Sequence, residues 1–125
     1  MGDRMQSTTY TYDETSDTLS ISFAPGERAT GVELTDHIIL RINKAERRAI
    51  GMTVLDYSLV AQATEIGPRS FPLIGLMELS AEMRELVIDI LRREPVNEIV
   101  ALSAYTPSMS EQIPIIWLHP LTISA

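Results

Sequence analysis

Apolar and polar residues alternate along the first half of the chain, from Ser7 to about Tyr57. Alternation with a period of two is typical of strands with one buried and one solvated face, whereas a helix repeats every ~3.6 residues. The alternating apolar positions are Leu19, Ile21, Phe23, Val32, Leu34, Ile38, Leu40, Ile42, Ile50, Met52 and Val54. The connections between them are too short for parallel crossovers and are rich in turn formers. The pattern predicts an antiparallel five-stranded β-meander over residues 7–57, with one apolar and one hydroxyl-rich face.

The alternation stops in residues 62–79, where Gly67, Pro68, Pro72 and Gly75 interrupt an apolar stretch. Glycine and proline at this density favour irregular backbone. We expect this segment to be a connector that lies across the body of the domain.

An amphipathic helix is predicted over residues 80–94. Ser80 is a favourable N-cap, Arg92 and Arg93 lie in the last turn, and Pro95 prevents continuation. Its apolar stripe consists of Met83, Leu86, Val87, Ile90 and Leu91. Asp89 and Arg93 are an oppositely charged pair four residues apart and fall outside this stripe. Because a striped helix and a one-sided sheet must both bury apolar surface, we expect an α+β layer structure.

Two further strands are predicted in residues 98–118, separated by a polar turn. The most apolar segment contains the interface candidates Ile113, Ile115, Ile116, Trp117 and Leu118. Pro114 and Pro120 favour an edge strand here, which a homodimer would cover. The nearly continuous apolar run instead favours an interior strand covered by the connector around residues 73–77. The sequence leaves both placements open.

Three segments of the N-terminal half keep a fixed spacing. They are Tyr12-Asp13 followed by Asp17-Thr18-Leu19-Ser20-Ile21-Ser22-Phe23, then Val32-Glu33-Leu34-Thr35-Asp36, and then Ile50-Gly51-Met52-Thr53-Val54-Leu55-Asp56. Over about residues 10–60 this pattern resembles the bacterial domain-of-unknown-function 2283 family. Members commonly carry an Asp and Gly turn before the last strand, whereas this chain has residues 43–48, so we expect a longer or differently bent hairpin. The resemblance implies a small β-rich module and transfers no catalytic residue.

Length and composition narrow the possible classes. The chain has 125 residues, which fits one domain over residues 1–125. A formal net charge of -7 disfavours a nucleic-acid partner, because phosphate backbones are repelled. The absence of cysteine excludes disulfides and thiolate chemistry. No apolar run approaches the length of a membrane span or a secretory signal, so we expect a cytoplasmic protein without a membrane partner.

Carboxylates are the main candidates for chemistry. Asp13, Glu14 and Asp17 share one predicted turn, and Asp36 and Asp56 are expected at other ends of the same sheet. Oxygen clusters suit Mg²⁺ or Ca²⁺, and paired carboxylates can exchange protons with a substrate. However, the turn lacks the glycine and distal glutamate of a calcium loop, and Asp is an ordinary turn former.

The two histidines, His37 and His119, lie in no ligand-pair spacing, and no nucleotide-binding, zinc-protease or hydrolase-elbow motif is present. The sequence therefore favours a non-enzymatic module without a cofactor, which self-associates as a dimer and binds a protein partner. The acidic surface suits a basic partner, as in a small regulatory or antitoxin-like protein that masks one. The alternative is a metal-assisted hydrolase, or another small-molecule enzyme, that uses Asp13, Asp17, Asp36 and Asp56.

Overall fold

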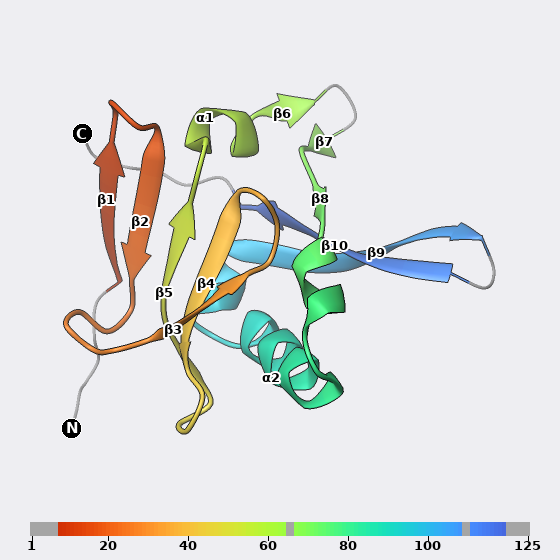
Figure 1. Ribbon diagram of the computed structural model, residues 1–125. Coiled ribbons are helices and arrows are strands. Elements are labelled where there is room, and N and C mark those ends of the chain that lie inside the picture. The colour runs from red at the N-terminus through yellow and green to blue at the C-terminus, as the bar shows by residue number, and fades with distance from the viewer. Residues whose placement is uncertain (1–7, 65–66, 109–110, 120–125) are drawn as a thin grey trace.

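The computed structural model describes residues 8–64, 67–108 and 111–119 and confirms the predicted α+β fold (Figure 1). A five-stranded antiparallel sheet comes first, a helix follows, and a three-stranded sheet ends the chain. The strands of the first sheet are β1 (Thr9–Asp13), β2 (Thr18–Ser22), β3 (Thr30–Glu33), β4 (Ile38–Asn43) and β5 (Arg48–Val54). The later elements are α1 (Tyr57–Val60), β6 (Ala63–Thr64), β7 (Gly67–Pro68), β8 (Phe71–Pro72), the 3₁₀ turn η1 (Ile74–Glu78), α2 (Ala81–Arg92), the 3₁₀ turn η2 (Val96–Glu98), β9 (Val100–Ser108) and β10 (Glu111–Leu118).

The order of the first sheet differs from the predicted meander. The strands lie in the order β1-β2-β5-β4-β3, so β2 pairs with β5 and β3 is at the far edge. The reason is burial. Strands β2 and β4 bury alternate residues and β5 buries most of its residues, whereas β3 buries only Val32 and β1 buries no residue. Residues 23–29 form the crossing, and the amides of Phe23 and Ala24 both bond to the Ile50 carbonyl on β5.

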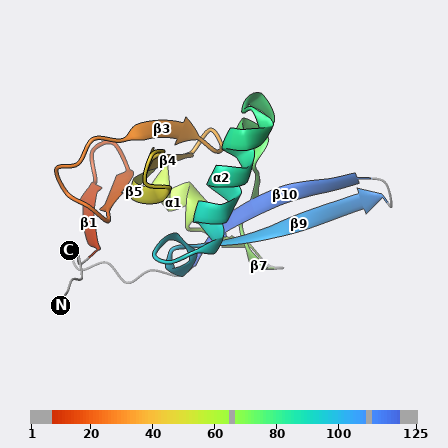
Figure 2. The same cartoon turned by 90° about the horizontal axis from the view of Figure 1, so that it is seen from below.

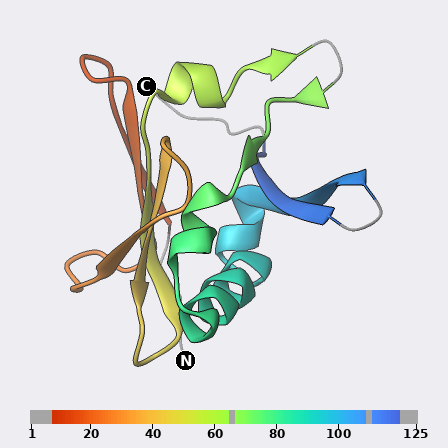
Figure 3. The same ribbon diagram turned by 45° about the vertical axis from the view of Figure 1, so that its right-hand side comes forward.

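One face of this sheet carries the core. Leu19, Ile21, Leu40, Met52 and Val54 are all fully buried and face the helix layer. The opposite face carries Ser20, Ser22 and Thr53, which remain partly exposed. Figures 2 and 3 show α2 and η1 stacked on the apolar face, with the β9–β10 hairpin beyond them.

Helix α2 begins and ends where its local signals predict. The Ser80 side chain accepts a hydrogen bond from the Met83 amide (3.1 Å), and Arg93 pairs with Asp89 at 3.0 Å. Leu86, Val87, Ile90 and Leu91 are buried, and Met83 packs against them. None of the helices in the described part of the chain has the length and hydropathy that a membrane span requires.

The predicted connector contains β6, β7, β8 and η1. The Gly75 amide donates to the Leu34 carbonyl, next to β3 (3.0 Å). A Cβ on Gly75 would overlap the Glu33 carbonyl, so only glycine permits this close approach. The guanidinium of Arg84 donates to the carbonyls of Leu76 and Leu79 and thereby ties η1 to α2.

The apolar C-terminal strand β10 is an interior strand, because it lies between β8 and β9. Pro114 is tolerated in this interior strand because its backbone faces β8 and the connector, and not β9. Its carbonyl accepts from the Leu73 amide (2.9 Å), so its nitrogen also faces the connector side, and the β9 ladder loses no donor. The sequence predicts a polar turn over residues 106–112. In the structure β9 continues to Ser108 and β10 begins at Glu111, so the strands include most of these residues.

Gly51 on β5 is required by a contact across the outer face. The Arg41 guanidinium crosses over it and donates to the Ile21 carbonyl on β2 (3.0 Å). A Cβ at Gly51 would lie 2.7 Å from that carbonyl oxygen, closer than van der Waals contact allows. The glycine therefore lets one side chain link three strands.

The stripe of α2 can be tested with a buried charge. We expect Leu86→Asp and Ile90→Asp each to lower the free energy of unfolding by at least roughly 3 kcal/mol, because each leaves a cavity and an unpaired carboxylate. Urea melts would measure the loss. Glu85→Ala, at an exposed position of the same helix, should stay within about 0.5 kcal/mol of the parent. Unchanged melts for both aspartate variants would place the stripe in solvent.

A second test concerns Gly51. We expect Gly51→Ala to destabilise the protein by about 1–3 kcal/mol, since either the Arg41 contact or the strand spacing must give way. The matched control is Gly31→Ala, where a Cβ meets only the Ile39 side chain at 3.7 Å. Equal melting temperatures for the two variants would show that the close approach at Gly51 has no energetic role.

Candidate functional site

The polar residues at one end of the first sheet form a connected cluster. Asp17 closes the β1–β2 turn with a left-handed backbone (φ 54°). Its carboxylate accepts from the Tyr12 hydroxyl (2.6 Å), the Ser58 amide (3.1 Å) and the Ser58 hydroxyl (2.9 Å), and its carbonyl accepts from the Tyr57 amide. Asp17 therefore joins the first hairpin to the start of α1.

These bonds shift two pKa values in opposite directions. The Tyr12 hydroxyl bond, followed by the bonds from Ser58, lowers the pKa of Asp17. The same bond to Asp17 raises the pKa of Tyr12, because the carboxylate favours the protonated phenol. Both groups keep their ordinary charge states at neutral pH, which suits a structural link.

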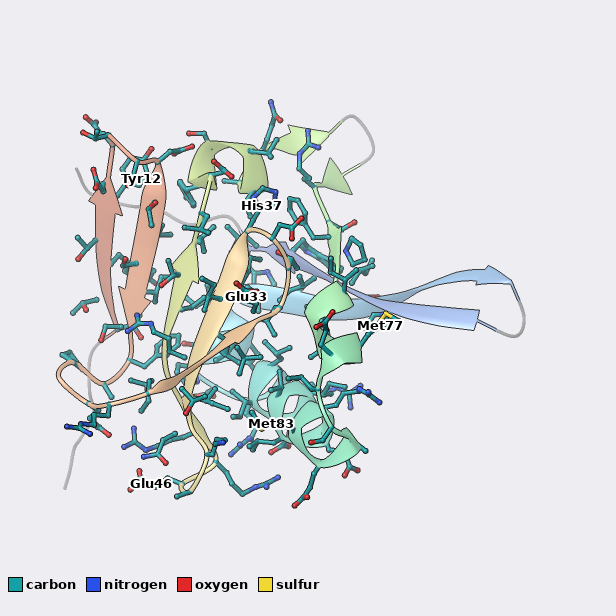
Figure 4. The ribbon with its side chains drawn as sticks, in the orientation of Figure 1. Tyr12, Glu33, His37, Glu46, Met77 and Met83 are labelled. Carbon is teal, nitrogen blue, oxygen red and sulfur yellow. The ribbon has the colours of Figure 1, made fainter. Side chains whose placement is uncertain are left out.

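His37 and Asp56 form a second pair at this end of the sheet. The Nδ1 atom of His37 lies 3.1 Å from Asp56 Oδ2, and the ring packs edge-on against Phe71 at 5.4 Å between centroids. Figure 4 shows Tyr12 on β1 and His37 just before β4, at the same end of the sheet. The Ser58 hydroxyl, which belongs to the same end of the sheet, donates to Asp17 and not to the Asp56–His37 pair.

The structure thus brings Asp17, Asp36 and Asp56 to one end of the sheet, but each has its own surroundings. Asp13 accepts the Thr15 amide (3.0 Å) in an ordinary turn, and Glu14 is exposed in the same turn. Among residues 8–64, 67–108 and 111–119, no three acidic or histidine side chains are placed to hold a metal ion. Asp13 and Asp17 act as hydrogen-bond acceptors within and next to the β1–β2 turn. His119, the other histidine, donates its backbone amide to the Ile99 carbonyl at the end of β10.

A groove lies along the edge of the β3–β4 hairpin. Its volume is about 790 Å³, and it lies between the edge strand β3, the turn η1 and the start of α2. Its apolar lining includes Ile74, Leu79 and Met83, and its ionisable lining residues are Glu33, Asp36 and Glu78. Such a volume lies within the range of small-ligand and peptide pockets.

Comparison with known proteins finds one family model that matches the region of the first sheet. Residues 9–58 match the family described as Protein of unknown function (DUF2283). No curated protein and no solved structure matches the chain. The match confirms the resemblance that the spacing of the three N-terminal segments suggested.

The DUF2283 region includes the strands β1–β5 and the polar cluster around Asp17, His37 and Asp56, with Gly51 within it. The groove, in contrast, is shared between this region and later residues, because Ile74, Glu78 and Met83 lie outside the match. Between β4 and β5, residues 44–47 form a four-residue loop in which Arg47 adopts a left-handed backbone (φ 54°).

Sequence reasoning missed the groove. Its walls come from positions about 40 residues apart, and nothing local in residues 30–33 distinguishes an open edge from a paired one. The available signal was Gly75, the only glycine near the end of the connector, since a conformationally free residue there permits a close backbone approach.

The predicted interface residues divide between core and surface. Ile116 and Leu118 are buried in the core, whereas Ile115 and Trp117 are half-buried. The side chain of Ile113 lies outside the described residues. A role of this segment in an interface stays a prediction.

The bond between Tyr12 and Asp17 can be tested by titration. In Tyr12→Phe we expect the pKa of Asp17 to rise toward its ordinary value, because the main cause of its lowering is removed. A carboxyl with a lowered pKa contributes stability above its ordinary pKa and loses it as the pH falls through the lowered value. Between about pH 6 and pH 2 the parent should therefore lose more stability than Tyr12→Phe.

Carboxyl NMR titration and urea melts would measure both effects. Tyr10→Phe is the control, since Tyr10 lies on the same strand and has no part in the Asp17 bonds. If the pKa of Asp17 were the same in the parent and in Tyr12→Phe, the hydroxyl bond would not be its cause.

Proposed function

We propose that this protein is a non-enzymatic binding module that self-associates, with two copies pairing through the outer edge of β9. The observation that carries the proposal is the edge itself. Strand β9 is the outer strand of its sheet, and no other described strand pairs with its far side. It is nine residues long and contains no charged residue. Natural edge strands usually carry charges or are short, which prevents pairing with another chain.

The alternation of hydrogen bonds along β9 identifies the open positions. Pro114 faces away from β9, so its partner Ala104 presents its own N–H and C=O outward. By the same alternation, Leu102 presents its backbone outward, whereas Ala101 and Ser103 bond to β10. An antiparallel pairing of two β9 strands would satisfy these open groups in both copies.

The distribution of charge also favours β9 as the surface through which two copies pair. Two copies of a chain with a formal net charge of -7 repel each other, and a contact is least opposed where carboxylates are absent. The β9–β10 hairpin projects from the body, which separates it from the acidic turns of the first sheet (Figure 1). The proposal also places the protein in the cytoplasm, which rests on the sequence pattern alone.

Light scattering at increasing concentration tests the pairing. We expect a mass of about twice 13.9 kDa for the parent and a shift toward 13.9 kDa for Ser103→Lys and Ala104→Pro. The lysine is placed at an exposed position of the edge, and the proline removes an outward donor without removing a bond to β10. Thr11→Lys, on the exposed edge strand β1, makes the same change in charge and should leave the mass of the parent unchanged.

A parent that stays monomeric at every concentration would contradict the proposal. A dimer that Thr11→Lys dissociates as strongly as Ser103→Lys would also contradict it, because the contact would then depend on net charge and not on β9.

A further inference from the structure

We infer that the groove between β3, η1 and α2 binds an extended segment of a partner protein in which basic and apolar side chains alternate. The inference deepens the proposed binding function by naming a partner class, and it uses a surface other than β9. The groove, the strand edge beside it and the charge around it each specify one property of the partner.

The strand edge specifies an extended backbone. The Leu34 amide bonds to the Ile38 carbonyl in the hairpin turn. By the alternation of an antiparallel pair, the backbone N–H and C=O of Val32 therefore face β4, and those of Gly31 and Glu33 face away from it. Their outward backbone groups border the groove. Turn η1 covers the end of this edge, where the Gly75 amide bonds to the Leu34 carbonyl and Gly75 packs against the Glu33 carbonyl, and it leaves Gly31 uncovered. A short strand can therefore add to β3 beside Gly31, as in peptide recognition by strand addition.

The walls of the groove specify alternate apolar side chains. Ile74 is 49% exposed although it is a large apolar residue, and Leu79 and Met83 are half-buried beside it. Figure 4 labels Glu33 on β3 and Met83 on α2, which belong to opposite walls. In an added strand every second side chain would point toward these apolar residues, and the others would point outward.

The charge specifies lysine or arginine at the outward positions. All three ionisable residues that line the groove are carboxylates: Glu33, Asp36 and Glu78. The nearby guanidinium of Arg84 is bonded to the carbonyls of Leu76 and Leu79 and is absent from the lining. The carboxylates favour a basic segment and disfavour a second copy of this chain, whose net charge is -7.

The groove is also held in its open shape before any partner arrives. The close approach of Gly75 to Glu33 and the bonds from Arg84 fix η1 relative to both β3 and α2. A preformed groove loses little conformational freedom on binding, which favours recognition of a short segment.

Synthetic peptides test this inference. The probe is a capped hexapeptide of alternating lysine and valine, and two matched peptides serve as controls. One carries glutamate in place of lysine, and the other is methylated at alternate backbone nitrogens so that it cannot pair as a strand. Titration followed by amide NMR should show binding of the first peptide, with the largest shifts at Gly31 and Glu33, and at least roughly tenfold weaker binding of both controls.

Variants of the protein separate charge from backbone pairing. Glu33→Lys and Glu78→Lys should each weaken binding of the lysine peptide by roughly fivefold or more, whereas Glu14→Lys, which makes the same change in the distant β1–β2 turn, should weaken it by less than about twofold. Gly31→Pro removes the outward N–H and should abolish the backbone contribution, whereas Gly31→Ala keeps this N–H and should bind the lysine peptide more tightly than Gly31→Pro. Thermal melts would show whether Gly31→Pro folds, and the charge variants test the inference in either case.

Three results would overturn the inference: no binding of the lysine peptide up to its solubility, equal binding of the acidic or methylated peptide, or equal effects of Glu14→Lys and Glu33→Lys. Light scattering of the same samples reports pairing through β9 separately. A dimer that binds no peptide would refute the groove alone, and a monomer that binds the lysine peptide would refute β9 pairing alone.

Discussion

The contact between the apolar stripe of α2 and the inner face of the first sheet is the interaction on which the structure depends. Neither partner can remain folded in water with its apolar side exposed, because burial of these side chains is the main favourable term in folding. The packing of this stripe also determines where η1 and the β9–β10 hairpin lie. Arg84 holds η1 from the same helix, and β9 packs beneath it, so the groove and the projecting hairpin are both placed by this one layer.

The helix ends and the strand positions were predictable from the sequence, because they depend on interactions between residues close together in the chain. Ser80 and Pro95 limit α2 through a cap and a missing donor, and these effects act within a few residues. Alternation similarly identified the strands of the DUF2283 region and their buried face. The order of the strands was not predictable in this way, because it depends on which strands bury most surface. Strand β3, with one buried residue, is placed at the edge although it follows β2 in the chain.

The candidate site shows the same division. The sequence placed Asp13 and Asp17 in one turn, and the structure agrees, but the Ser58 and Tyr12 bonds that occupy Asp17 depend on the packing of α1 against the hairpin. The groove could not be predicted, since its walls meet only after the connector folds back along β3. Gly75 is the point at which the two segments meet, and a single glycine in a connector carries little information before its neighbour is known.

Pro114 has an effect on the stoichiometry of any assembly built from the second sheet. On the side of β10 away from β9, Ile115 and Ile116 are already paired with β8, and Pro114 has no N–H to offer an incoming strand. Along residues 114–116, the side of β10 away from β9 is therefore closed to a further strand, whereas the outer side of β9 is not. Two copies that meet through β9 form a closed pair, because each copy uses the same edge, whereas pairing through two different edges would allow an open-ended fibre.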